Sequence, residues 1–106
     1  MEIKNEFGSV EYHLPNIPEA MELLSKIGLK PDEFSNKDLV EQKQFMIMSK
    51  LISNVGFLVD KIDLSHNNKK YEKYEDVLTN FAFLPIVTEI ATKVMKCFEV
   101  SEEKKD

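Results

Sequence analysis

Apolar and polar residues alternate near the start of the chain. Every second residue from 10 to 14 is apolar and the residues between them are polar, which is the period of a strand with one buried face. Gly8 marks a turn between this run and a shorter one before it. We therefore predict a β-hairpin over residues 1–14, with strands at about 2–6 and 9–14. An isolated hairpin is marginal in water, so one face should pack against helices or pair with another chain.

A helical period begins after Pro15. Asn16 stands three residues before Glu19, which is the spacing of a capping box at a helix start. Gly28 is the residue type expected in the left-handed position that ends a helix. These signals predict a helix over residues 17–27. Its expected inner face consists of Ile17, Ala20, Leu24 and Ile27.

Apolar residues that recur every three or four positions predict three further helices, over residues 37–62, 71–81 and 86–100. Pro85 should break or kink the chain between the last two of these. Gly56 lies inside the longest predicted helix, where we interpret it as a point of close helix packing or of a slight bend rather than as a hinge.

The predicted fold class is mostly α. It is a small bundle of about four helices with a short N-terminal β-hairpin, folded as a single domain over residues 1–100. Residues 101–106 contain no apolar side chain, so we expect a flexible charged tail there.

Composition narrows the classes of partner. The chain has 106 residues, a formal net charge of -5, and 14 lysines but no arginine or tryptophan. Nucleic-acid binding is not expected, because it depends on a basic face that neutralises phosphates. No apolar run approaches the roughly 20 residues that span a bilayer, so no membrane partner is expected either. The single Cys97 cannot form an intramolecular disulfide, which favours a reducing compartment, and we predict a cytoplasmic protein.

The sequence contains none of the standard catalytic patterns. Its two histidines, His13 and His66, are far apart in sequence, and we interpret both as solvated side chains. Asp60 and Asp63 lack the glycine and the final glutamate of a calcium loop. We therefore predict no catalytic residues, no metal site and no cofactor, and expect that the protein is not an enzyme.

One cluster joins basic and aromatic residues. Lys69, Lys70 and Lys73 are interleaved with Tyr71 and Tyr74, a combination that can stack on single-stranded bases. Acidic residues among them cancel the local positive field, so we interpret the tyrosines as turned inward. These acidic residues are Glu72, Glu75 and Asp76.

The predicted helix over residues 37–62 carries a second apolar stripe outside its main face. Leu39, Met46 and Phe57 are seven and eleven residues apart, spacings that return to nearly the same angle on a helix. One interpretation is that this stripe packs inside the protein. The other is that it binds a protein partner, since Met and Phe side chains suit apolar protein contacts.

The N-terminal part of the sequence resembles small tail-assembly chaperones of tailed bacteriophages. The likeness covers mainly residues 7–28 and rests on the strand exit into a capped helix, Glu11-Tyr12-His13-Leu14-Pro15-Asn16-Ile17-Pro18-Glu19-Ala20. The resemblance implies a non-enzymatic protein in the host cytoplasm that binds the tape-measure protein and aids assembly of the tail tube. Such proteins often act as oligomers, so a homo-oligomer is among the states that the resemblance implies.

A second hypothesis needs no phage relative. The acidic residues Glu72, Glu75 and Asp76 suit a small regulator or inhibitor that binds a basic surface of a host protein. Salt distinguishes the two hypotheses, because screening weakens contacts between charges far more than apolar contacts.

Overall fold

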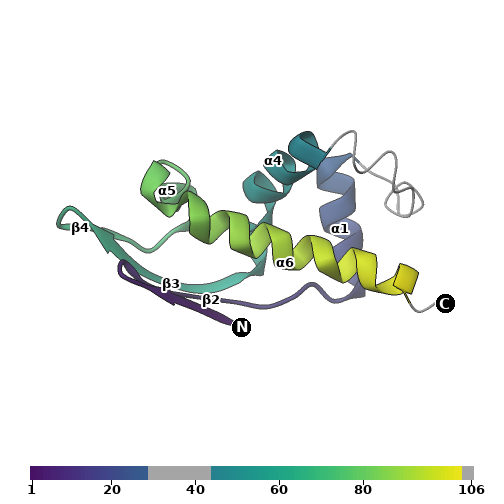
Figure 1. The fold of residues 1–106 in the computed structure, drawn as a ribbon, viewed down its shortest axis with the longest axis horizontal. Coiled ribbons are helices and arrows are strands. Elements are labelled where there is room, and N and C mark those ends of the chain that lie inside the picture. Colours follow the sequence, from purple (N-terminus) through teal and green to yellow (C-terminus); the bar gives the residue numbers. More distant parts are fainter. Residues whose placement is uncertain (29–43, 104–106) are drawn as a thin grey trace.

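The computed structural model describes residues 1–28 and 44–103, and it is a small α+β fold (Figure 1). Four strands form one antiparallel sheet in the order β1-β2-β3-β4: Glu2–Asn5, Gly8–Tyr12, Val59–His66 and Lys69–Tyr71. The α-helices are α1 (Ile17–Ile27), α4 (Gln44–Asn54), α5 (Tyr74–Val77) and α6 (Leu84–Glu103). Two short 3-10 turns, η1 (Val55–Leu58) and η2 (Phe81–Phe83), precede β3 and α6. The prediction of a mostly α bundle is therefore wrong.

The N-terminal hairpin and the first helix are confirmed. β1 and β2 pair from Glu2 opposite Glu11 to Asn5 opposite Gly8. Helix α1 has the predicted bounds, and Asn16 and Glu19 form the capping box at its start. The inner face is only partly as predicted, since Leu24 and Ile27 are buried with Leu23, whereas Ile17 is largely exposed.

The long helix predicted over residues 37–62 is wrong in its second half. Residues 37–43 lie outside the described residues, and α4 ends at Asn54. After the η1 turn the chain becomes β3, in which Ile62 and Leu64 are buried and their neighbours exposed. Val59 and Ile62 are spaced as on one helix face, but both belong to β3, where Ile62 is buried and Val59 is partly buried against the core.

The helix predicted over residues 71–81 is also wrong. β3 turns into β4 through Asn67 and Asn68, both of which have positive φ, as a two-residue type I′ hairpin requires. Asparagine tolerates this conformation better than most residues. Tyr71 therefore ends a strand, and only the single turn of α5 is helical before η2.

The last helix begins earlier and ends later than the predicted 86–100. Pro85 is the second residue of α6, where a missing backbone N–H costs nothing because the first turn has no intrahelical acceptor. At the other end α6 runs to Glu103, so it includes the first residues of the segment predicted to be a flexible tail over residues 101–106.

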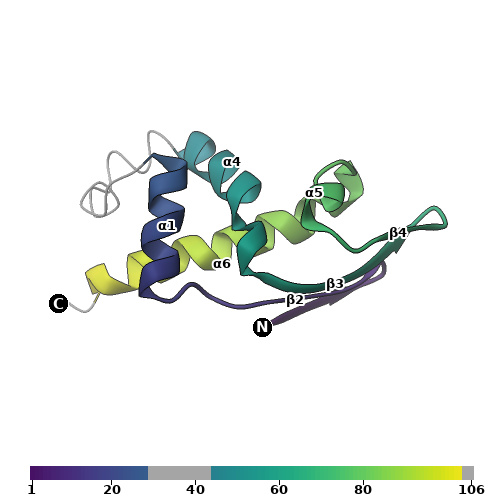
Figure 2. The same cartoon turned by 180° about the vertical axis from the view of Figure 1, so that it is seen from behind.

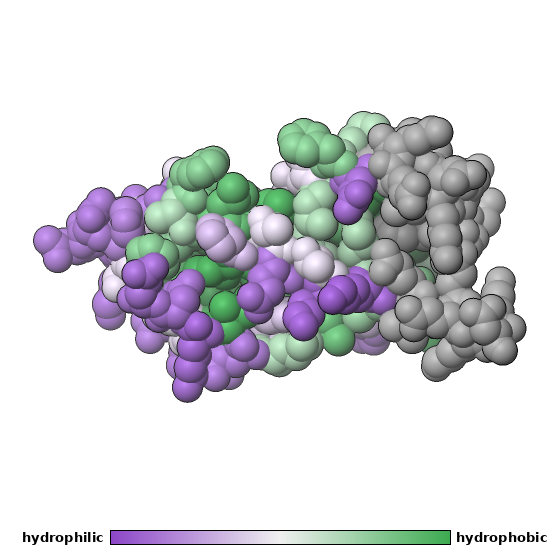
Figure 3. Space-filling view, in the orientation of Figure 1, coloured by the Kyte–Doolittle hydropathy of each residue, from purple (hydrophilic) through white to green (hydrophobic). Residues whose placement is uncertain are grey.

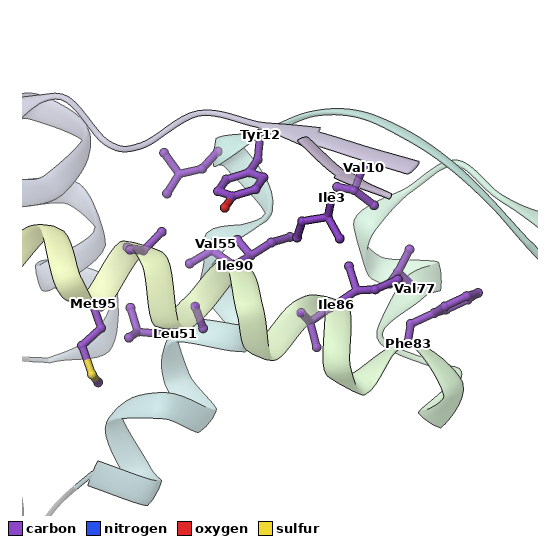
Figure 4. Packing of buried hydrophobic residues seen from close by; sticks show 14 of the residues in the cluster. Ile3, Val10, Tyr12, Leu51, Val55, Val77, Phe83, Ile86, Ile90 and Met95 are labelled. Carbon is purple, nitrogen blue, oxygen red and sulfur yellow. The ribbon is translucent and has the colours of Figure 1, made fainter. Parts of the chain in front are cut away.

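The core lies between one face of the sheet and α6, and it continues between α6, α4 and α1. Figure 4 shows the side chains of Ile3, Val10 and Tyr12 directed from the sheet toward Ile86 and Ile90 of α6. Figure 2 shows α6 running from α5 to the N-terminal end of α1. α4 lies between α5 and α1, on the side of α6 away from the sheet. The opposite face of the sheet carries only exposed or half-exposed polar side chains, including Glu2, Lys4, Ser9, Glu11, Lys61, Asp63 and Ser65.

None of the helices in residues 1–28 and 44–103 is long and apolar enough to cross a membrane.

Candidate protein-binding surface

The predicted partner stripe is not one continuous helix face. Leu39 lies outside the described residues. Met46 is exposed on α4, whereas Phe57 belongs to η1, after α4 has ended. Phe57 is half-buried against the core, and the Lys26 ammonium lies 4.5 Å from the centre of its ring. Partner binding by these three residues stays a prediction.

A different apolar group is exposed where α5 connects to α6. Phe81 is 83% exposed, and Leu78 and Leu84 are each 40% exposed. We call Leu78, Phe81 and Leu84 the 78–84 surface. Figure 3 shows apolar side chains reaching the surface over α5 and the first turns of α6. Because a 3-10 turn repeats every three residues, Phe81 and Leu84 lie on the same side of the chain.

The backbone that carries the 78–84 surface is held in place. The Asn80 side chain accepts a hydrogen bond from the Ala82 N–H at 2.9 Å. Its amide nitrogen lies 3.0 Å from both the Tyr71 hydroxyl and Nδ1 of His66. Backbone N–H groups of Thr79, Asn80 and Phe83 donate to carbonyls three residues earlier. The exposed side chains are therefore displayed on an anchored connection and not on a loose loop.

Two buried residues, one before Leu78 and one between Phe81 and Leu84, fix which way the exposed residues face. Val77 and Phe83 are fully or nearly fully buried. The Phe83 ring meets the rings of Phe7 and Tyr71 edge to face, at centroid distances of 5.4 and 4.8 Å. Since Phe83 is locked into this aromatic cluster, Phe81, two residues earlier, points outward.

Sequence reasoning missed this surface because it predicted one continuous helix over residues 71–81. One local signal could have revealed it. Asparagine is a strong helix-capping residue, and proline is common in the first turn of a helix. Asn80 followed by Pro85 therefore indicates that a new helix begins near residue 84, and not that an earlier helix ends there.

Apolar side chains are also exposed in two other places. Ile17 and Met21 lie one turn apart on the outer side of α1 and are exposed, as is Leu14 before the helix. Phe45 and Met46 are exposed at the start of α4. Phe45 is the second described residue after the gap at residues 29–43, so the 78–84 surface is the better defined candidate.

The strongest polar cluster surrounds His13, which is not the freely solvated side chain that the sequence suggested. Its Nε2 lies 2.9 Å from the Glu19 carboxylate and its Nδ1 lies 3.0 Å from that of Asp60. Asp60 is the extra residue of a β-bulge, between the pairs Glu11–Lys61 and Tyr12–Val59, and bulges commonly redirect a side chain in this way. The cluster ties β2, α1 and β3 together.

The charges of this cluster reinforce one another. Hydrogen bonds to Glu19 and then to Asp60 raise the pKa of His13 above its ordinary value. The same bond to His13, followed by the backbone bond from Asn16, lowers the pKa of Glu19. Within residues 1–28 and 44–98, the side chains that bond to the His13 ring are the carboxylates of Glu19 and Asp60 alone. The arrangement suits a structural ion pair.

The remaining candidate chemistry is also accounted for by packing. Tyr71 is buried, and the Tyr74 hydroxyl donates to the Ile52 carbonyl, so both tyrosines are turned inward as predicted. Cys97 is half-buried, and burial raises the pKa of its thiol. Among the side chains of residues 1–28 and 44–98, no group of three or more His, Cys, Asp or Glu could hold a metal ion.

No family model, curated protein or solved structure matches this chain.

Proposed function

We propose that this protein is a non-enzymatic, cytoplasmic protein-binding factor that holds an apolar segment of a partner protein on the 78–84 surface. The observation that carries the proposal is the contrast between Phe81, 83% exposed, and Phe83, fully buried, within one 3-10 turn. Exposed aromatic side chains on a rigid backbone lose little conformational entropy on binding, and they dominate the energy of many protein interfaces.

The surroundings of the 78–84 surface define the chemistry of the partner. Glu72, Glu75 and Asp76 are exposed just before it, with Lys73 as the single nearby base in residues 72–84. A matching partner segment would be apolar, to cover Phe81 and its neighbours, and would carry lysine or arginine at its ends. An amphipathic helix with basic flanks fits this description, because its apolar stripe can cover a short row of side chains.

The resemblance to tail-assembly chaperones names a first partner to test. In that class the client is the long, largely helical tape-measure protein, whose apolar faces need cover until tail-tube subunits surround it. The 78–84 surface would supply such cover, and the net charge of -5 would help to keep the complex soluble.

Site-specific photo-crosslinking in the native host tests the proposal. The photoreactive amino acid p-benzoylphenylalanine replaces Phe81 in one strain and Lys61, on the polar face of the sheet, in a control strain. We expect one protein to crosslink at position 81 and also at positions 78 and 84, but not at 61. Crosslinking equal to that at position 61 would contradict the proposal.

The alternative of an acidic regulator is favoured by the same three acids, Glu72, Glu75 and Asp76, all of which are exposed. Its partner would be a folded basic surface rather than an apolar segment. The affinity of the purified protein for the crosslinked partner distinguishes the two hypotheses. Raising the salt concentration would weaken a regulator complex steeply, whereas Phe81→Ser would leave its affinity unchanged. For an apolar complex, salt would change the affinity little and Phe81→Ser would weaken it.

A further inference from the structure

We propose that two copies of this chain pair through β1 and form one continuous eight-stranded sheet. β1 is the first strand in the sheet order, so its outer edge carries no strand in the described structure (Figure 1). Such an edge presents unpaired N–H and C=O groups to a second strand. This proposal does not depend on the function of the 78–84 surface.

The hydrogen-bond pattern determines which residues of β1 face outward. Residues 1 and 12 exchange both backbone bonds, from the Tyr12 N–H to the Met1 carbonyl at 2.9 Å and from the Met1 nitrogen to the Tyr12 carbonyl at 2.7 Å. Bonded pairs alternate along an antiparallel ladder, so Ile3 and Asn5 also bond to β2. The backbone groups of Glu2 and Lys4 therefore point away from the sheet.

Only one register of an antiparallel β1–β1 pair joins opposite charges within the strand. Glu2 of each copy then faces Lys4 of the other, twice, with four backbone hydrogen bonds. Shifting the register by two residues places Lys4 opposite Lys4, or Glu2 opposite Glu2, and like charges directly opposite are destabilising. A further shift pairs Lys4 with Glu6, which lies in the turn after the strand.

The apolar face agrees with this register. Ile3, the central residue of the pair, faces the core and is 9% exposed. Ile3 of one copy would lie directly opposite Ile3 of the second copy, so the two cores would join beneath the sheet. The symmetry axis passes between these two residues and stands perpendicular to the sheet. The contact is self-complementary, as a twofold dimer requires.

The other edge of the sheet is unsuited to the same pairing. β4 has three residues. The Ser65 N–H bonds to the Phe7 carbonyl, so Ser65 does not bond to Lys70, its partner in β4. Lys70 is therefore the one β4 residue whose backbone N–H and C=O point away from the sheet. Lys70 would face Lys70 of another copy. The two edges therefore favour a closed dimer over an open fibre.

Backbone and charge variants test the dimer in sedimentation velocity over a range of protein concentrations, with any tag at the C-terminus. Lys4→Pro removes an outward N–H and leaves the bonds to β2 intact. We expect the Lys4→Pro protein to sediment as a monomer and to keep the circular dichroism spectrum of a folded protein. A wild-type protein that stays monomeric at all concentrations, or a Lys4→Pro protein that dimerises as tightly as wild type, would overturn the proposal.

Charge exchange tests the register itself. E2K places Lys opposite Lys and K4E places Glu opposite Glu, so each variant alone should dimerise on the order of tenfold more weakly. Mixed together, E2K and K4E should form a heterodimer in native mass spectrometry, and the double variant E2K/K4E should recover the homodimer. Glu75→Lys and Lys93→Glu, exposed residues outside the sheet, make the same changes in net charge and should dimerise as wild type does. Equal effects of control and strand variants would overturn the register.

Discussion

The ring of Tyr74 lies against the bare backbone of Gly56: a Cβ placed on Gly56 would stand 2.8 Å from Cδ2 of the ring. The Tyr74 hydroxyl meanwhile donates to the Ile52 carbonyl at the end of α4. These contacts join α5 to the turn between α4 and β3. They confirm the interpretation of Gly56 as a point of close packing.

Gly56→Ala should destabilise the protein by about 1–3 kcal/mol, because the ring must move or strain. Tyr74→Ala creates the missing space, so adding Gly56→Ala to that variant should cost much less than it does in wild type. Urea denaturation of the four proteins in this cycle gives the coupling energy. If the two substitutions instead lower the free energy of unfolding additively, the ring does not exclude a side chain at position 56.

Gly8→Ala should destabilise the protein more than Gly56→Ala does. Gly8 has a φ of 137°, and a Cβ there would stand 2.0 Å from the Asp63 carbonyl oxygen, a backbone atom that cannot rotate away. We expect a loss of roughly 3 kcal/mol or more in the free energy of unfolding. Ser9→Ala, on the polar face beside it, is the control and should change stability little. A Gly8→Ala protein as stable as that control would refute the close approach of β2 and β3.

The His13 cluster should make stability depend on pH. Because the folded pKa of His13 is raised from 6.5, its contribution is complete below that value and is lost as pH rises through the folded pKa. Because the folded pKa of Glu19 is lowered from 4.5, its contribution is complete above that value and is lost as pH falls through the folded pKa. Both contributions are therefore complete between about pH 4.5 and 6.5.

The unfolding free energy of wild type should thus fall between pH 6 and pH 8 by more than that of His13→Gln. Glu19→Gln keeps a capping oxygen for the Asn16 N–H but removes the charge, so its profile should also be flatter than that of wild type. Urea titrations at several pH values measure all three profiles. Parallel curves for wild type and His13→Gln would contradict the ion pairs.

Local signals allowed the N-terminal third of the fold to be predicted. The Asn16–Glu19 capping box and Gly28 fix α1 without help from the rest of the protein. β3 was missed because Val55, Val59 and Ile62 fit a helical period as well as a strand. The decisive signal was Asn67-Asn68, a pair that accepts positive φ and so closes a two-residue hairpin.

The candidate surface could not be predicted from periodicity, because it depends on tertiary contacts. Leu78 and Phe81 look like inner positions of a helix until α5 ends after a single turn. Their exposure follows from the anchoring of Asn80 on Tyr71 and His66, two residues that the unpredicted pairing of β3 with β4 brings to the same hairpin. The sequence also led to the hypothesis of an apolar protein contact, which it placed on Leu39, Met46 and Phe57, and partner binding by those residues stays a prediction.

The most direct test of the protein-binding proposal compares two phenylalanines of one turn. Phe81→Ser should change the unfolding free energy by no more than about 0.5 kcal/mol because Phe81 is exposed, whereas Phe83→Ser should cost several kcal/mol. Binding of the partner crosslinked at position 81 is then measured by isothermal titration calorimetry with wild type and Phe81→Ser. The account predicts at least about tenfold weaker binding for Phe81→Ser, as expected for loss of an aromatic anchor. Equal affinity of the two proteins, with equal stability, would contradict it.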